Sequence, residues 1–358
     1  MTLNCWYLHN GIYMDNTKTG YRVLPCCQYG HIEDFEVVES PAEIHEHKFM
    51  KQIKDEFSKG IKHEGCRLCW ENERVLGYSK RTRANDYVET EKHNGIHQNW
   101  DLRPGNICNL KCVMCQPTLS SKWYEDIDVW EKHREQHDTI KRIKEWKPFN
   151  WDYVFKHTPN NAYKIYIAGG EPLYDKKVFE FIEYLSTFEW NIENTNFLIN
   201  TNGISYTEKW NNVFKKFKKT PMFIISVDGT EVVDNYIRFP SDYNTKKKQT
   251  KYLKEQGFKT TFNLTISALN FPNTLQMLKH WPAGCNTLEH PYFLHINSLK
   301  PDVIYRIKKQ KNKPAYINNL IRQYRYNEDG NRRLKSYLKD LDAKRGTNSM
   351  ISIPWCWV

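Results

Sequence analysis

The chain has 358 residues, of which 39% are hydrophobic, 27% are charged and ten are cysteines. This length can bury one large core and add a smaller domain. The sequence has no run of 18 apolar residues, so we expect no membrane-spanning helix and no membrane partner. Residues 1–6 lack the basic and apolar regions of a secretion signal, so we expect a cytoplasmic protein. In a reducing compartment, clustered cysteines more often bind metal than form disulfides.

The formal net charge of +11 is unevenly placed. Residues 300–345 contain 14 Lys and Arg against 5 Asp and Glu, a balance of +9. Concentrated positive charge favours an anionic partner, such as a phosphate, an acidic peptide or nucleic acid. A solvated helix face explains the same charge run equally well. The sequence leaves both interpretations open for this basic helical C-terminal extension, which we place at residues 300–358.

The first 95 residues are expected to form a small Cys-rich α+β domain. Residues 6–9 and 20–24 flank a turn-rich segment and predict a β-hairpin. Ser40, Pro41 and Glu43 are typical of a helix start. The apolar positions of that helix recur at helical spacing, and Gly60 follows them as its end: Ile44, Met50, Ile53 and Phe57. Residues 80–95 are polar and indicate a linker or an exposed helix end.

Four cysteines of this N-terminal segment are candidates for one metal site: Cys5, Cys26, Cys66 and Cys69. Two lie at the start and end of the predicted hairpin, and two form a CxxC knuckle. Cys26 and Cys27 are adjacent in a strand-like stretch, where neighbouring side chains point to opposite faces. At most one of the two is expected to join the site, and we prefer Cys26. Zinc, an iron–sulfur cluster and inert buried thiols all remain open for this set.

From about residue 98 the sequence alternates between short apolar runs and helical patterns. The expected strands are residues 100–103, 164–168, 196–199, 222–227, 260–266 and 292–296. Expected helices cover residues 175–188, 207–218 and 244–256. This alternation predicts parallel strands with crossover helices, an α/β domain that we place at residues 96–299.

Three cysteines lie within eight residues directly after the first of these strands, at Cys108, Cys112 and Cys115. A single loop can bring three thiolates to one point. Such a set holds a soft metal site and leaves one coordination position open. Cysteine thiolates are also the standard ligands of iron–sulfur clusters.

Polar motifs follow the next predicted strands as well. They are Gly169-Gly170-Glu171, Thr201-Asn202-Gly203, Asp228-Gly229 and Ala268-Leu269-Asn270. In α/β barrels the active site lies at the carboxyl ends of the strands. The position of every motif after a strand therefore predicts one site.

The Cys108-x3-Cys112-x2-Cys115 motif, the Gly-Gly-Glu-Pro segment at 169–172, and the segments 200–203 and 226–229 resemble the radical SAM superfamily in order and spacing. The resemblance spans about residues 98–296. It implies a partial (β/α)6 TIM-like barrel and a [4Fe–4S] cluster on the three cysteines, with one iron open to S-adenosylmethionine (SAM). It further implies an enzyme that reductively cleaves SAM to a 5′-deoxyadenosyl radical, which abstracts hydrogen from a substrate.

The same resemblance assigns SAM contacts to further residues. It places Gly169, Gly170 and Glu171 at the methionyl ammonium, Ser226 and Asp228 at the ribose, and Arg238 at the methionyl carboxylate, with Asn202 and Asn270 as further contacts. Each motif also has a structural alternative. Gly-Gly with a following Glu can be a capped turn, and Asp-Gly is a common turn.

The N-terminal segment resembles the SPASM/twitch modules that carry auxiliary [4Fe–4S] clusters, although here it precedes the barrel. The resemblance favours a second cluster over zinc. It implies a reducing electron donor such as a flavodoxin or ferredoxin. The expected substrate is a peptide or a small anionic metabolite.

Three alternatives stay open: a radical SAM enzyme acting on RNA, a zinc-stabilised nucleic-acid-binding protein, and a non-catalytic partner in an assembly. Cys285 is expected to be a free loop thiol. Cys356, between Trp355 and Trp357, is a candidate additional ligand.

Overall fold

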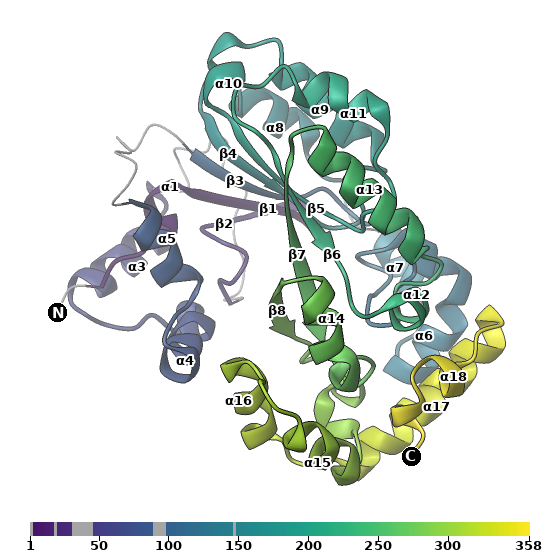
Figure 1. The fold of residues 1–358 in the computed structure, drawn as a ribbon. Coiled ribbons are helices and arrows are strands. Elements are labelled where there is room, and N and C mark those ends of the chain that lie inside the picture. The colour runs from purple at the N-terminus through teal and green to yellow at the C-terminus, as the bar shows by residue number, and fades with distance from the viewer. Residues whose placement is uncertain (1–2, 18–19, 31–45, 89–97, 146–147) are drawn as a thin grey trace. The chain divides into compact units, whose positions relative to one another are not determined.

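The computed structural model describes residues 3–17, 20–30, 46–88, 98–145 and 148–358 (Figure 1). The chain divides into two compact units. The first unit comprises Met1–Gly105, Lys144–Ile199 and Thr207–Pro221, and the second comprises Asn106–Ile143, Asn200–Tyr206 and Met222–Val358. These units do not follow the boundaries near residues 95 and 299 that the sequence suggests.

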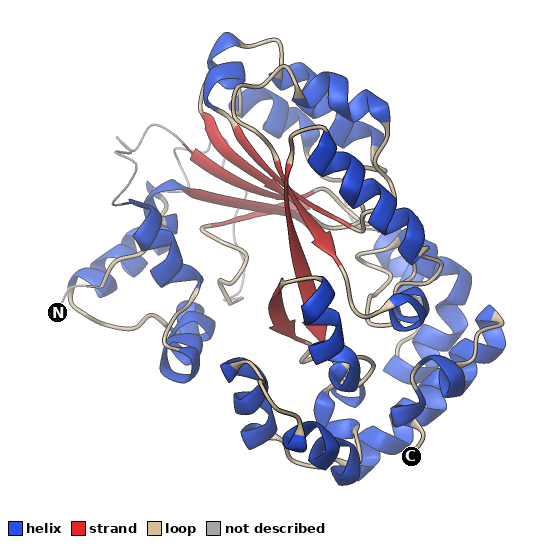
Figure 2. Cartoon of the chain, in the orientation of Figure 1, coloured by secondary structure: helices blue, strands red, loops and turns tan. Residues whose placement is uncertain are grey.

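The first unit contains a mostly parallel sheet, and strands are drawn in red in Figure 2. The strand order in this unit is β2-β1-β3-β4-β5. Its strands are β1 (Gly11–Thr17), β2 (Gly20–Leu24), β3 (Gln98–Arg103), β4 (Ala162–Ile167) and β5 (Asn196–Thr201), of which β5 ends in the second unit. Among the described strand pairs of this unit, β1 and β2 are antiparallel and the others are parallel. Trp100 and Leu102 of β3 and Ile165 and Ile167 of β4 are fully buried. Their alternation with polar residues defines an apolar face of the sheet.

Helices cover this apolar face. The Trp100 ring lies 6.5 Å from that of Tyr153 in α8 (Trp151–His157), and Trp151 lies 5.6 Å from Phe181 in α9 (Lys176–Leu185). The other helices of this unit are α1 (Tyr7–Asn10), α3 (Lys48–Ser58), η1 (Glu64–Cys66), α4 (Arg67–Leu76), α5 (Lys80–Val88), α10 (Glu189–Asn194) and α11 (Glu208–Phe214).

The second unit has three parallel strands in the order β6-β7-β8: β6 (Met222–Ser226), β7 (Lys259–Ile266) and β8 (Ala283–Thr287). Its helices before residue 290 are η2 (Ser121–Asp126), α6 (Ile127–Arg134), α7 (Thr139–Lys144), α12 (Glu231–Ile237), α13 (Tyr243–Glu255), η3 (Phe271–Asn273) and α14 (Thr274–His280). Those after it are η4 (Tyr292–Leu294), η5 (Ile296–Ser298), α15 (Pro301–Lys309), α16 (Ala315–Gln323), α17 (Glu328–Arg345), α18 (Ser349–Ser352) and η6 (Pro354–Cys356).

Helix α17 is part of the core of the second unit. Asn327 caps its start by accepting from the Gly330 amide, and Gly346 ends it in a left-handed conformation with φ +65°. Its inner face buries Leu334, Tyr337, Leu338 and Leu341, and the Tyr337 hydroxyl donates to the Val113 carbonyl at 2.9 Å. The C-terminal extension is therefore helical as predicted, but α17 packs inside its unit.

The predicted α/β class with a partial barrel of parallel strands and crossover helices is confirmed. The expected strand at 292–296 is wrong, because these residues form η4 and η5 with Phe293, Leu294 and Ile296 buried. A short apolar run indicates burial but does not separate strand from helix. Strand β8 was missed because its residues, Ala-Gly-Cys-Asn-Thr, lack an apolar pattern.

The N-terminal hairpin also differs from expectation. Residues 7–10 form α1, and the first strand begins at Gly11. Strand β1 pairs in parallel with β3, so the hairpin joins the sheet that continues after residue 98. The expected helix start at 40–44 lies outside the described residues, whereas Met50, Ile53 and Phe57 are buried on α3. Among the described helices, none has the length and apolar character needed to cross a membrane.

The contribution of Asp126 to the stability of the second unit can be tested by substitution. Its side chain is 1% exposed and bonds both Lys111 Nζ, at 2.8 Å, and Arg345 Nε, at 2.6 Å. Asp126→Ala leaves the buried Arg345 without its carboxylate, whereas Lys111 keeps Glu125 at 3.1 Å. We therefore expect the free energy of unfolding to fall by about 3–5 kcal/mol in chemical denaturation. Asp128→Ala is the matched control, because its pair with Lys344 is exposed and should cost less than about 1 kcal/mol. Equal losses in the two variants would contradict the core role of Asp126.

Candidate metal centres and their surroundings

The loop after β3 carries Cys108, Cys112 and Cys115, and all three are half-buried. Burial raises the pKa of the Cys112 and Cys115 thiols. The pKa of Cys115 is raised further by negative charge on Cys112 and Cys108, which shows that the three sulfurs share one neighbourhood. Cysteine binds a metal as the thiolate. Because these thiolates are partly buried, a nearby cation has to offset their negative charge.

The backbone of this cysteine loop is fixed on both sides of Cys112. The Lys111 amide donates to the Phe239 carbonyl and the Val113 amide donates to the Ile237 carbonyl, each at 2.7 Å. The Cys112 carbonyl accepts from the Trp123 indole at 3.0 Å. The central cysteine therefore has a defined position before any ligand binds.

Arg238 lies between the two carbonyls that hold the loop. Its Nε is 2.7 Å from Asp228 Oδ2, and Asp228 is 0% exposed. Burial raises the pKa of Asp228 and the Arg238 charge opposes that rise. The same guanidinium opposes the rise in the pKa of Cys112. One cation thus serves a buried carboxylate and a cysteine of the loop.

Further buried charges surround this pair. The Asp228 carboxylate also accepts from the Thr265 amide at 2.9 Å, and the Asp228 amide donates to Asp234 at 2.8 Å. Asp234 forms an ion pair with Lys246, and both side chains are fully buried. Sequence reasoning placed Asp228 at the SAM ribose and Arg238 at its carboxylate. In the structure these two side chains pair with each other, and their contacts with SAM stay a prediction.

The ends of β5 and β7 contribute amide side chains. Asn202 Nδ2 donates to Asn109 Oδ1 at 2.8 Å, which links the end of β5 to the cysteine loop. Asn270 is fully buried, and its amide bonds the Ser267 amide and the Thr265 carbonyl, both at 2.9 Å. Asn270 therefore braces its own loop, and its contact with SAM stays a prediction. Ser226 ends β6 and is buried.

Gly169, Gly170 and Glu171 follow β4 in the first unit. Both glycines have positive φ, +92° and +57°, which other residues rarely adopt. Glu171 is 1% exposed, and its Oε1 accepts from the Leu173 amide at 3.1 Å. The segment therefore forms a capped Gly-Gly turn, and its contact with SAM stays a prediction.

The four N-terminal candidates, Cys5, Cys26, Cys66 and Cys69, line one pocket in the first unit. Tyr29, Lys80 and Arg81 are also in its lining. Burial raises the pKa of Cys5 to about 11 and that of Cys26 to about 12, while Arg81 opposes the rise at Cys5 and Lys80 opposes it at Cys26. Cys27 is exposed and outside this lining, and its sulfur accepts from Lys80 Nζ at 2.9 Å. The Cys26 side chain therefore lines the pocket, whereas the Cys27 side chain lies outside its lining.

The donor atoms of both sets suit iron–sulfur clusters, because each thiolate of a cluster binds its own iron. The sulfurs around a cluster therefore lie farther apart than ligands around one ion. Within the part of the chain that the structure describes, no group of three His, Cys, Asp or Glu side chains is arranged to hold a single metal ion.

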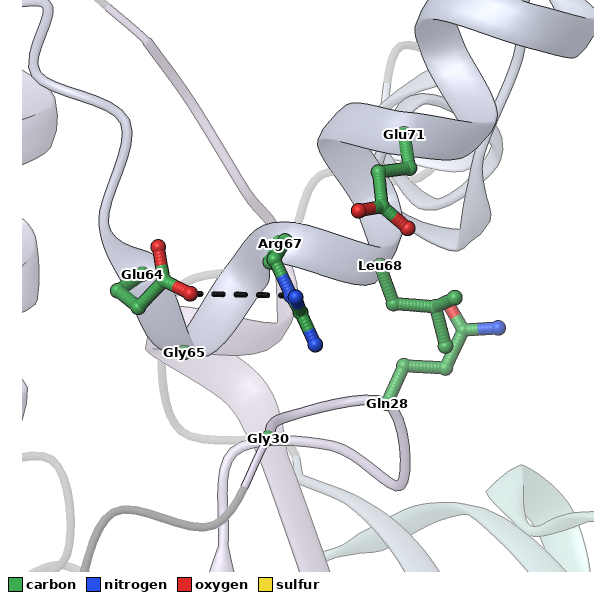
Figure 3. A pocket seen from close by; sticks show the side chains of 7 residues that line it. All are labelled: Gln28, Gly30, Glu64, Gly65, Arg67, Leu68 and Glu71. Atoms are coloured by element: carbon green, nitrogen blue, oxygen red, sulfur yellow. Dashed lines mark ion pairs between the residues drawn. The ribbon is translucent and has the colours of Figure 1, made fainter.

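An open pocket lies beside the CxxC knuckle (Figure 3). Its lining residues are Gln28, Gly30, Glu64, Gly65, Arg67, Leu68 and Glu71. The Gly30 amide donates to the Gly65 carbonyl at 2.7 Å, and Arg67 Nε lies 3.7 Å from Glu64. Gln28 also lines the cysteine pocket and accepts from the Cys69 thiol at 3.5 Å. Sequence reasoning missed this pocket, since its residues form no distinctive pattern.

A charged and aromatic group on β3 and β4 was missed as well. Asp101 Oδ1 is 2.8 Å from Arg103, and the guanidinium lies 4.8 Å from the Tyr166 ring. Asp101 is also 3.5 Å from Lys80. These residues alternate with Trp100 and Leu102, so they face away from the helix-covered side of the sheet. That period-two alternation was the signal that could have identified them.

The remaining cysteines lie elsewhere. Cys356 is fully buried, and its thiol lies 3.5 Å from the Ala268 carbonyl, which also accepts from the Trp355 indole at 3.1 Å. The tail therefore docks through its tryptophan, and this thiol is directed at a backbone carbonyl. Cys285 belongs to β8 and lies 3.0 Å from the Tyr316 hydroxyl.

The Arg238–Asp228 pair can be tested without any cofactor. Arg238→Met leaves a buried carboxylate unpaired, and we expect the free energy of unfolding to fall by about 3–5 kcal/mol. Combining it with Asp228→Asn removes the orphaned charge. The double variant should therefore lose less than the sum of the single variants, with a coupling of about 1 kcal/mol or more in urea denaturation. Additive losses would argue against the pair.

Comparison with known proteins agrees with these observations. Residues 102–272 match the family model described as the radical SAM superfamily, and this segment contains all three loop cysteines. No curated protein matches the chain.

Similar solved structures include native anSMEcpe with bound AdoMet, at 16% identity and a TM-score of 0.38, covering 68% of this chain and 61% of that chain. Streptococcus suis SuiB has 16% identity and a TM-score of 0.36, covering 97% and 71%. TYW1 with a lysine–pyruvate adduct has 16% identity and a TM-score of 0.32, covering 58% and 70%. The chain thus spans about three fifths of the anSMEcpe length. Residues 102–272, just under half of the chain, are therefore the segment that is similar to the radical SAM superfamily of enzymes.

Proposed function

We propose that this protein reductively cleaves SAM and uses the product to abstract hydrogen from a substrate. Cys108, Cys112 and Cys115 would hold a [4Fe–4S] cluster, leaving one iron without a protein ligand. When bound, the cluster supplies the electron that splits SAM into methionine and a 5′-deoxyadenosyl radical. The observation that carries the proposal is the loop of three neighbouring cysteines, fixed around Cys112, within the segment that matches the family.

The residues around the loop have separate tasks in this proposal. Arg238 offsets the charge of the thiolates, because its guanidinium stabilises the ionised form of Cys112. The amides of Lys111 and Val113 hold the loop backbone, and Asn202 ties it to the end of β5. A loop that is positioned before ligand binding loses less conformational entropy when the ligands bind. The candidate SAM contacts stay Gly169, Gly170, Glu171, Asn202, Ser226, Asp228, Arg238 and Asn270.

Cys5, Cys26, Cys66 and Cys69 would hold an auxiliary [4Fe–4S] cluster. Their common pocket supports this assignment, and so do Lys80 and Arg81 in its lining, because cations offset the charge of four thiolates. Zinc is the competing occupant, and it lacks the visible absorption of an iron–sulfur cluster. The reaction also requires a one-electron donor, for which a flavodoxin or ferredoxin is suitable. The substrate is proposed to be anionic, either a peptide, a small metabolite or RNA.

Replacing Cys108, Cys112 and Cys115 together by alanine should abolish formation of 5′-deoxyadenosine, because the cluster that delivers the electron is lost. The measurement is mass spectrometry of the products after anaerobic reconstitution and reduction with dithionite. Bound iron should fall from about eight to about four per chain. Cys285→Ala is the control, since Cys285 belongs to neither set, and it should cleave SAM at the rate of the unaltered chain. Normal cleavage by the triple variant would refute the proposed function.

A matched pair of neighbouring cysteines tests the N-terminal set. Cys26→Ser removes a thiolate from the pocket lining and should lower bound iron toward about four per chain, together with the visible absorption. Cys27→Ser changes an exposed thiol outside the lining and should leave iron near about eight. Iron loss in Cys27→Ser with retention in Cys26→Ser would reverse the assignment. A colourless N-terminal site that contains zinc would exclude the auxiliary cluster.

A further inference from the structure

One segment of the second unit carries a large share of the positive charge of the chain. We call residues 300–326, which include α15 and α16, the basic strip (Figure 1). The strip contains eight Lys and Arg residues and a single acidic residue, Asp302, a balance of +7 out of the chain total of +11. The eight are Lys300, Arg306, Lys308, Lys309, Lys311, Lys313, Arg322 and Arg325.

The apolar residues of the strip face its unit, and the cations face solvent. Helix α15 buries Val303, Ile304 and Ile307, and α16 buries Ile317. Seven of the eight cations are exposed and Lys313 is half-buried. Each helix therefore packs against its unit through one face. This packing does not explain the positive charge on the solvent-facing side.

Within the part of the chain that the structure describes, the strip cations have no carboxylate partners. Among the ion pairs of the described residues, none includes a cation of the strip. The contacts that the strip cations do make are to neutral groups, such as Arg325 Nη1 to the carbonyls of Arg322 and Tyr324. Helix α17 is different, because Arg333, Lys344 and Arg345 pair with acidic residues at 2.6–3.1 Å. These three cations of α17 therefore form ion pairs within the unit, whereas the cations of the strip are available to an anionic partner.

The strip also carries two exposed tyrosines among its cations. Tyr305 is 56% exposed and Tyr326 is 40% exposed. The Lys309 ammonium lies 4.3 Å from the centre of the Tyr305 ring. Cations that follow a backbone of phosphates, with flat rings for base stacking, characterise surfaces that bind single-stranded nucleic acid. An acidic peptide would be matched by the cations but gives no reason for the rings.

We propose that the basic strip binds a single-stranded nucleic acid, such as an RNA strand or loop. Its cations would neutralise phosphates, and Tyr305 and Tyr326 would stack on bases. This inference goes beyond the proposed reaction, because it concerns a binding partner and does not depend on SAM cleavage. Binding and cleavage are measured separately, so the failure of one is distinguishable from the failure of the other.

The test uses the anaerobically reconstituted protein and a fluorescein-labelled, single-stranded RNA of mixed sequence, with affinity measured by fluorescence anisotropy over a series of KCl concentrations. Each phosphate contact contributes about −0.7 to the slope of log K against log salt. The variant Arg306→Gln, Lys309→Gln, Arg322→Gln should therefore bind at least about tenfold more weakly at low salt, with a slope reduced by about 2. The matched control Lys247→Gln, Lys248→Gln, Lys251→Gln removes the same charge from exposed positions of α13 and should bind like the unaltered chain.

Stacking is tested with Tyr305→Ala, which should weaken RNA binding by about fivefold or more without changing the salt slope. A labelled poly-glutamate peptide is the second probe. Equal losses in the strip variant and the α13 control would overturn the proposal and leave the strip a solvated face. Tight peptide binding together with no effect of Tyr305→Ala on RNA would also overturn it, in favour of an acidic peptide partner.

Discussion

The ion pair between Arg238 and Asp228 is the interaction on which the surroundings of the cysteine loop depend. A carboxylate without solvent exposure is costly to ionise, and so is a buried thiolate. Arg238 lies close enough to stabilise both Asp228 and Cys112. The carbonyls on either side of it, from Ile237 and Phe239, hold the backbone of the cysteine loop. Arg238 therefore offsets negative charge through its side chain, while the carbonyls of its two neighbours fix the backbone of the cysteine loop.

The four-cysteine pocket of the first unit depends on segments that are distant in the sequence. Cys5 precedes α1, Cys26 follows β2, and Cys66 and Cys69 lie at the turn from η1 into α4. Arg81 of α5 helps to join these segments, because it donates to the Asn4 carbonyl and forms an ion pair with Glu73 of α4. Its charge also acts on the thiols that it helps to position. As with Arg238, one guanidinium combines a structural and an electrostatic role.

Positive charge has two different uses in this chain. The cations of α17 pair with acidic residues of its own unit, among them Asp126 and Asp128, and so contribute to folding. The basic strip that precedes α17 has no such pairs among the described residues. Unpaired like charges repel one another and destabilise a compact state. A surface that keeps them together beside exposed tyrosines is better explained by a polyanionic partner than by the needs of the fold.

The sequence by itself determined the α/β class, the strands from β3 to β7 and the cysteines that define both sets, because these depend on local spacing and on period-two or helical patterns. It also separated Cys26 from Cys27, since adjacent strand residues face opposite ways. Only the tertiary structure decided that β1 joins β3, that residues 292–296 are helical, and that Asp228 pairs with Arg238. It likewise divided the C-terminal charge between α17 and the basic strip. The physical reason is that parallel pairing, burial and ion pairing are contacts between residues far apart in the chain, and neither spacing nor composition records which partner a side chain will meet.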